Sequence, residues 1–147
     1  MFASIVVGTD GSPSAGEAVR QAAELAARLD ARLDIVSAYE PVSQSRMRRE
    51  AQQIPEDDEW MINVREDVDA TLRDAAALAQ AAGVTAETWA RQGDPADAIL
   101  DVAEERDAEL VVVGHRGATG ARRFLLGSVP NRVSHHAPCS VLIIRTG

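Results

Sequence analysis

The residues best suited to chemistry lie in the stretch 114–128, GHRGATGARRFLLGS, which directly follows the apolar run ELVVV. Glycines allow the backbone to turn sharply and to bring its N–H groups close to a ligand. Between them stand the cationic side chains of His115, Arg116, Arg122 and Arg123. In a chain with a formal net charge of −8, this local concentration of arginine predicts an anionic ligand, and phosphate suits the pattern. The alternative is that Arg122 and Arg123 only solvate a surface loop.

The end of this stretch predicts the start of a helix. Ser128 follows Gly127 and is a plausible N-cap residue, and Val129 comes next. The backbone N–H groups of a first helical turn, together with the helix dipole, attract anions. The helix start therefore adds backbone donors to the cationic side chains.

A second glycine-containing segment, GTDGS, follows the apolar run at 2–8. Asp10 is suited to accept hydrogen bonds from a ribose hydroxyl or to contact Mg²⁺ that a nucleotide brings with it. An aspartate in a turn also commonly bonds its own backbone, and the two interpretations are evenly balanced. Neither segment contains a P-loop motif or a G-x-G-x-x-G dinucleotide fingerprint.

Strands and helices that alternate along the chain would position these segments. The pattern is typical of an α/β domain with a parallel sheet, right-handed crossovers and helices on both faces. We predict one domain over residues 1–147 and an open five-stranded sheet of order 3-2-1-4-5. Ligands then bind between strands 1 and 4, where the strand order reverses. The predicted strands are 2–8, 32–41, 84–93, 108–114 and 139–145; the predicted helices are 12–31, 60–82, 94–108 and 128–137; and 42–58 is a long exposed connection.

The composition excludes several classes of protein. The negative charge argues against a nucleic-acid or membrane-surface binder, and no apolar run reaches the roughly 18 residues of a membrane span. The start of the chain lacks the features of a signal peptide. A single cysteine, Cys139, excludes an internal disulfide and fits a reducing compartment. We therefore expect a cytoplasmic protein.

The last predicted strand indicates a partner. Val141, Leu142, Ile143 and Ile144 are apolar on both faces of a strand that the predicted order places at an edge. Solitary edge strands usually carry charges, proline or a bulge that block further pairing. We expect a two-fold homodimer through this strand, and the alternative is that the C-terminal tail or a helix covers it.

These motifs together are more specific than any one of them. Gly114-x-x-Gly117, nine residues and then Gly127-Ser128 resembles the nucleotide-binding signature of the universal stress protein family. IVVGTDGSPSAGEAV and HHAPCSVLIIR are similar to the two ends of the same family, so the resemblance spans the whole chain. It implies a Rossmann-like fold of the adenine nucleotide alpha hydrolase type, and a dimer formed through the last strand.

The resemblance to the ATP-binding members also implies a role for each matching position. The end of strand 1 would lie along the nucleotide, the end of strand 2 at the adenine edge, and the end of strand 4 along the adenosine and phosphates. The residues concerned are Gly8, Thr9 and Asp10 on the first segment, Ala38 on the second, Val113, Gly114 and Gly117 on the third, and Gly127, Ser128 and Val129 at the phosphate oxygens.

Two positions depart from the commonest form of the family. Pro130 stands where a hydroxyl or amide residue is frequent, and His115-Arg116 is bulkier and more cationic than usual. The segment LLGSVPNRVS is similar to a subgroup that prefers cyclic AMP. ATP with Mg²⁺, AMP and cyclic AMP therefore all stay open as ligands.

The signals for catalysis are weak. Phosphoryl transfer needs a positioned base, a cation that neutralises charge and usually Mg²⁺, and the chain contains no lysine. A nucleotide-binding regulatory dimer is our first interpretation. A slow ATPase or an autokinase that uses Ser128 as acceptor is the second. A flavodoxin-like electron carrier is the third, although neither strand exit, GTDGS after the first strand or GHRG after the fourth, contains Phe, Tyr or Trp to stack on a flavin.

Overall fold

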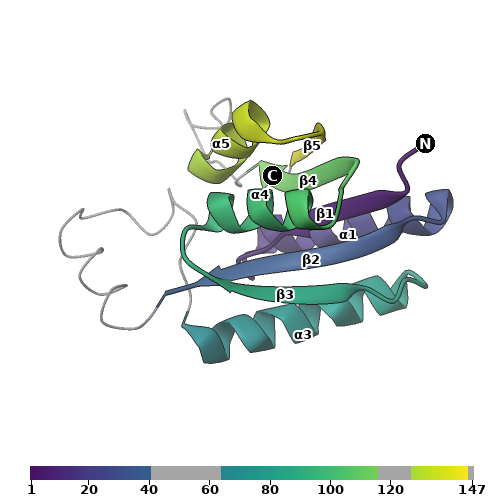
Figure 1. Cartoon of the computed structure of the whole chain (residues 1–147). Helices are drawn as coiled ribbons and strands as arrows, with labels where there is room; N and C mark the ends of the chain where they lie inside the picture. Colours follow the sequence, from purple (N-terminus) through teal and green to yellow (C-terminus); the bar gives the residue numbers. More distant parts are fainter. Residues whose placement is uncertain (41–63, 116–126, 146–147) are drawn as a thin grey trace.

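The computed structural model describes residues 1–40, 64–115 and 127–145 (Figure 1). Strands and helices alternate along these ranges, as the sequence predicts. The strands are β1 (Ser4–Gly8), β2 (Arg32–Tyr39), β3 (Glu87–Gln92), β4 (Leu110–His115) and β5 (Ser140–Arg145); the helices are α1 (Pro13–Leu29), α3 (Arg65–Ala81), α4 (Pro95–Glu105) and α5 (Ser128–His136).

The five strands form one parallel sheet in the order β3-β2-β1-β4-β5, so the predicted topology is confirmed. Figure 1 shows α1 and α3 on one face of the sheet and α4 and α5 on the other. β1 pairs with β2, with Gly8 opposite Val36, and with β4, with Val7 opposite Val112. Because all strands run in the same direction, the ends of β1 and β4 lie side by side at the carboxyl edge. The strand order reverses at this point.

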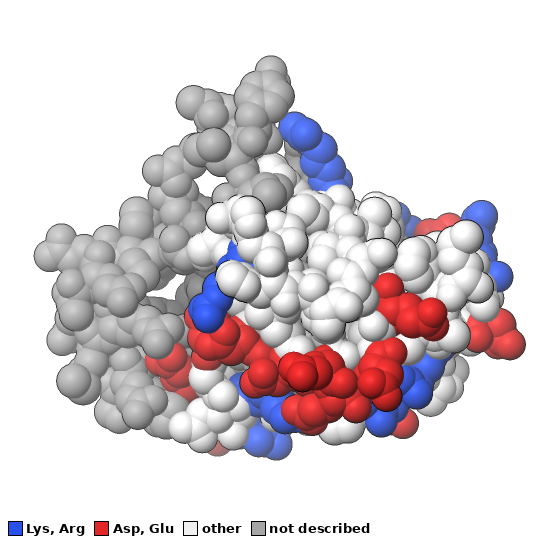
Figure 2. All heavy atoms as spheres, turned by 45° about the horizontal axis from the view of Figure 1, so that its top comes forward, with Lys and Arg blue, Asp and Glu red and all other residues white. Residues whose placement is uncertain are grey.

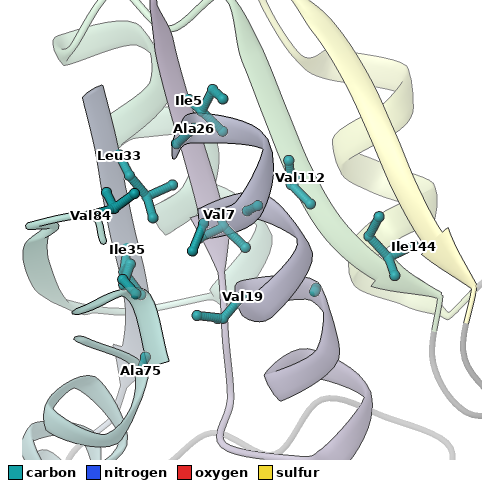
Figure 3. Close-up of a cluster of buried hydrophobic side chains, with 14 of the residues drawn as sticks. Ile5, Val7, Val19, Ala26, Leu33, Ile35, Ala75, Val84, Val112 and Ile144 are labelled. Atoms are coloured by element: carbon teal, nitrogen blue, oxygen red, sulfur yellow. The ribbon is translucent and has the colours of Figure 1, made fainter. Parts of the chain in front are cut away.

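The core beneath α1 is built from small and branched side chains (Figure 3). Ala18, Ala22 and Ala26 are buried along α1 and allow the helix to approach the sheet closely. Leu29, at the last helical position, is 37% exposed. The sheet residues in the cluster are Ile5, Val7, Leu33, Ile35, Leu110, Val112 and Ile144.

The opposite face of the sheet carries the second core cluster. Ile99, Val102 and Ala103 of α4 are buried against it, as the periodicity of that helix predicts. Val129 and Val133 of α5 join the same cluster. α4 and α5 thus form a well-packed layer on this face of the sheet.

Two helix starts agree with their sequence signals. Ser12 is the N-cap of α1, and its hydroxyl accepts a hydrogen bond from the Ala15 N–H at 3.2 Å. Asp94 is the N-cap of α4, and its carboxylate accepts from the Asp97 N–H at 3.0 Å. In both helices proline follows the cap, where its missing N–H costs nothing.

Other boundaries differ from the predictions. β3 begins at Glu87 rather than at 84, so the predicted edge strand is shorter. The start of the second predicted helix and the connection at 42–58 lie outside the described residues. Within α3 the buried positions include Leu72, whereas Leu78, predicted to be on the apolar face, is 39% exposed.

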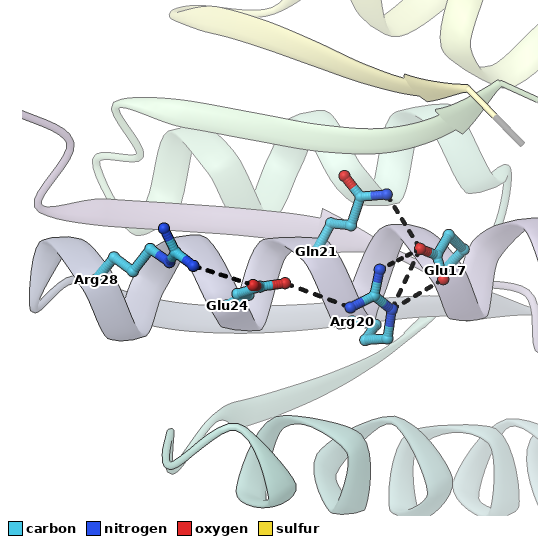
Figure 4. Close-up of polar contacts among 5 residues, drawn as sticks. All are labelled: Glu17, Arg20, Gln21, Glu24 and Arg28. Carbon is cyan, nitrogen blue, oxygen red and sulfur yellow. Dashed lines mark hydrogen bonds and ion pairs between the residues drawn. The ribbon is translucent and has the colours of Figure 1, made fainter.

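The exposed face of α1 carries a series of charged side chains at helical spacing (Figure 4). Arg20 donates from Nε to Glu17 at 3.0 Å, and Glu24 lies between Arg20 and Arg28. The hydrogen bond from Arg20, with a smaller contribution from Gln21, lowers the pKa of Glu17 to about 2. Such exposed pairs favour the helix modestly and leave its opposite face for packing.

A buried carboxylate connects β2, β3 and α4 on the other face. Asp34 is fully buried, and its Oδ1 accepts a hydrogen bond from the Trp89 indole N–H at 2.9 Å. Arg106 forms an ion pair with the same oxygen at 3.3 Å, and Arg32 with the other oxygen at 3.5 Å. The Arg106 guanidinium also lies 5.2 Å from the centroid of the Trp89 ring. This network explains Trp89 as a packing residue of the monomer.

None of the described helices has the length and the apolar character needed to cross a bilayer.

Candidate functional site

The segment that leaves β1 forms a tight turn that leads into α1. The Thr9 N–H donates to the Val36 carbonyl at 2.9 Å, which extends the β1–β2 pairing by one residue. The Thr9 hydroxyl accepts from the Gly11 N–H at 3.1 Å, and the Asp10 carboxylate accepts from the Ser12 N–H at 2.9 Å. The turn contact predicted as one alternative for Asp10 is therefore present. Its contact with ribose or with nucleotide-bound Mg²⁺ stays a prediction.

Gly114 is not the turn residue that the sequence predicts, and its predicted place along the adenosine stays a prediction. It lies inside β4, so the chain does not turn there. A Cβ at this position would lie 2.9 Å from the Ser14 hydroxyl and 3.0 Å from the Ser14 carbonyl oxygen. The Ser14 hydroxyl in turn donates to the His115 carbonyl at 3.0 Å. Gly114 thus allows the first turn of α1 to pack directly on the end of β4, and this contact holds the two glycine segments together.

α5 starts at Ser128, where the predicted range begins, but its N-cap lies one residue earlier than predicted. Gly127, in extended conformation, is the N-cap, and Ser128 is the first helical residue rather than the cap. The helix begins there because the Gly127 carbonyl accepts the Asn131 N–H at 3.1 Å. Gly127 has no side chain, and α5 has no side-chain cap hydrogen bond. Because Pro130 lacks an N–H, this position of the first turn cannot donate to an anion.

The remaining described candidates gather on one face of the sheet. Ala38 and Val113 belong to the cluster beneath α4 and α5, and alternation along the strands places Gly8 and His115 on the same side. Val113 is fully buried and His115 is 5% exposed, so His115 does not project into solvent. The predicted residues from β1, β2 and β4 thus meet at the α4 and α5 side of the carboxyl edge.

The other candidates of the long loop lie outside the described residues. They are Arg116, Gly117, Arg122 and Arg123, and their contribution of positive charge and close backbone approach stays a prediction.

Two contacts at this edge could not be predicted from the sequence. One is the Ser14 hydroxyl on the end of β4. The other is Arg132 of α5, which forms ion pairs with Asp94 at 3.1 Å and with Asp97 at 2.7 Å at the start of α4. Both join residues of separate helices and strands, so no local spacing reveals them.

Figure 2 shows a band of acidic side chains over α4, with basic side chains beside it.

Among residues 1–40, 64–115 and 127–145, no three His, Cys, Asp or Glu side chains come together as a potential metal-binding group.

The fold and the carboxyl edge together define a class of protein: a single doubly wound α/β domain in which a glycine turn, the end of a neighbouring strand and a helix start without a side-chain cap lie at this edge. The model of the universal stress protein family matches residues 1–145. The chain belongs to the universal stress protein family.

Relatives of known sequence and structure agree with this assignment. Universal stress protein Rv1636 of Mycobacterium tuberculosis is 38% identical over 146 residues, which cover 99% of this chain and 97% of the relative. Universal stress protein YxiE of Bacillus subtilis is 36% identical over 148 residues, covering 99% and 100%. A crystal structure of a universal stress protein in complex with cAMP superimposes with a TM-score of 0.74 at 35% identity, covering 99% of this chain and 98% of that one.

Proposed function

We propose that this protein is an adenine-nucleotide-binding regulatory protein whose ligand lies at the carboxyl ends of β1 and β4. The observation that carries the proposal is the helix start of α5, which lacks a side-chain cap and follows the β4 exit at the edge where the strand order reverses. Such a helix start offers backbone N–H groups and the positive end of a dipole to a phosphate. The similar structure in complex with cAMP supports an adenosine phosphate as the ligand.

A single phosphate group suits this helix start better than a polyphosphate chain. Pro130 occupies the third position of α5 and removes one of the three backbone donors that a first turn otherwise supplies. AMP or cyclic AMP needs fewer donors than ATP does. We therefore propose the monophosphates as the preferred ligands, with Mg²⁺ required only if ATP binds.

Isothermal titration with adenosine, AMP, cyclic AMP and ATP, each with and without Mg²⁺, tests the proposal. We expect AMP or cyclic AMP to bind at least about tenfold more tightly than adenosine, because a charge-assisted hydrogen bond contributes about 1.5–3 kcal/mol. Equal binding of adenosine and AMP would remove the phosphate site. Steady phosphate release from ATP would favour the ATPase hypothesis instead.

A pair of variants at Ser128 tests whether its backbone amide binds the phosphate. Ser128→Pro removes the N–H at the first helical position, where proline is well tolerated, and Ser128→Ala removes only the hydroxyl. We expect about a tenfold loss of AMP affinity in Ser128→Pro and little change in Ser128→Ala. Adenosine affinity serves as the control for the rest of the site. The reverse ranking would indicate that the hydroxyl is the contact.

We also propose a homodimer formed through β5. Leu142 is 39% exposed on this strand, and Val141 and Ile143 are partly exposed. The other edge strand, β3, differs because charged Glu87 and Arg91 protect it from pairing. A two-fold axis would pair two copies of β5 in antiparallel orientation and bury these apolar side chains. The single cysteine is consistent with the cytoplasmic location proposed for the dimer.

A further inference from the structure

Arg132 connects the start of α5 to the start of α4. Its Nη1 lies 3.1 Å from Asp94 Oδ2, and its Nη2 lies 2.7 Å from Asp97 Oδ1. Asp94 Oδ2 also accepts the Asp97 N–H as the N-cap of α4. One guanidinium therefore contacts two carboxylates at the start of α4, and one of them is the N-cap.

This contact acts on the part of α5 that faces the proposed phosphate. Residues four apart lie on one side of a helix, so Arg132 and Ser128 share a face. Gly127 supplies no side-chain cap to fix the first turn. Val129 and Val133 pack in the core on the buried side of the helix. On the exposed side, the ion pairs of Arg132 connect α5 to the start of α4.

We propose that Arg132 is a positioning residue for the phosphate: by its ion pairs with Asp94 and Asp97 it holds the first turn of α5, with the amides of Ser128 and Val129, at the ligand edge. This inference rests on the proposed function. All three side chains are roughly half exposed, at 49%, 36% and 51%. The effect is therefore several-fold, not orders of magnitude.

Two alternative roles for Arg132 make opposite predictions. If Arg132 itself bound the phosphate, replacing Asp94 and Asp97 by asparagine would release the guanidinium and strengthen AMP binding. If the carboxylates mainly repelled the phosphate, the same replacement would again strengthen binding. If Arg132 positions α5, the replacement weakens binding as much as loss of the arginine does. Asparagine caps a helix as well as aspartate, so α4 is preserved.

The experiment is titration of AMP and of adenosine into the full-length protein and four variants. We expect Arg132→Gln and Asp94→Asn/Asp97→Asn each to weaken AMP binding about fivefold, with adenosine unchanged. Arg132→Lys should lose about twofold, because an ammonium lacks the fork that reaches both carboxylates. The matched control is Arg28→Gln. It removes another exposed ion pair, to Glu24 at 3.4 Å, with the same change of net charge at the far end of α1.

A measurement without ligand separates this inference from the proposed function. The Asn131 N–H forms the first backbone bond of α5, to Gly127 at 3.1 Å. Its hydrogen exchange should be several-fold faster in Arg132→Gln and in the double asparagine variant, and unchanged in Arg28→Gln. Unchanged AMP affinity in Arg132→Gln, or tighter binding in the asparagine variant, would overturn the positioning role alone. Wild-type protein that binds no adenosine phosphate would overturn the proposed function, and with it the inference.

Discussion

At the scale of single residues, Gly114 and Gly16 are glycines in opposite surroundings. A Cβ on Gly114 would contact the Ser14 hydroxyl at 2.9 Å and its carbonyl oxygen at 3.0 Å, and a backbone carbonyl has no alternative rotamer. A Cβ on Gly16, in α1, would meet nothing within 4 Å. The first glycine is needed for packing of α1 on β4, and the second only lowers the helix propensity of α1.

Alanine at these two positions should therefore change stability in opposite directions. We expect Gly114→Ala to lower the free energy of unfolding by about 1–3 kcal/mol, as overpacking does. We expect Gly16→Ala to raise it by about 0.5–1 kcal/mol, because alanine loses less conformational entropy in a helix. Urea unfolding followed by circular dichroism measures both. A neutral Gly114→Ala would mean that α1 is not tightly packed on the end of β4.

At the scale of elements, the sequence predicted the types and the order of the helices and strands better than their caps and contacts. The alternation of apolar runs with helical periodicity was enough for the parallel order β3-β2-β1-β4-β5, and proline after a polar residue located the starts of α1 and α4. Ser128 was wrongly predicted as a cap because an adjacent glycine satisfies the same pattern. The Ser14 and Arg132 contacts escaped prediction because they join residues far apart in the chain.

The network around Asp34 joins β2, β3 and α4, so we expect a change of this carboxylate to lower the stability of the protein. Asp34→Asn keeps an oxygen for the Trp89 indole but leaves Arg106 and Arg32 without a buried counter-charge. We expect a loss of about 1–3 kcal/mol, less than for a fully buried pair because both arginines reach solvent. Glu87→Gln is the control. It removes a 59% exposed partner of Arg106 and should change stability by less than about 0.5 kcal/mol. Similar losses in both variants would contradict a special role for the buried carboxylate.

At the scale of the whole molecule, the proposed ligand site and the proposed dimer contact lie at two different edges of the sheet. The candidate site at the carboxyl edge consists of strand ends and helix starts. β5 is an outermost strand, so its length lies along the side of the sheet, where a second copy could pair with it. β4 connects the two, because it pairs with β5 from Leu110 to His115 and ends at the candidate site. A ligand that shifts the end of β4 therefore acts on the strand next to the proposed dimer contact.

A comparison of two equally exposed leucines tests whether the protein forms a dimer through β5. Leu142 on β5 and Leu78 on α3 are each 39% exposed, and each is changed to glutamate. Two antiparallel copies of β5 would bring a pair of glutamates into an apolar contact, where burial of an unpaired charge is costly. We expect Leu142→Glu to sediment as a monomer at concentrations where wild-type protein and Leu78→Glu sediment as dimers. Circular dichroism should stay unchanged in both, because neither side chain belongs to the buried core. A dimer that persists in Leu142→Glu would place the interface elsewhere, and a monomeric wild-type protein would mean that β5 remains an exposed edge.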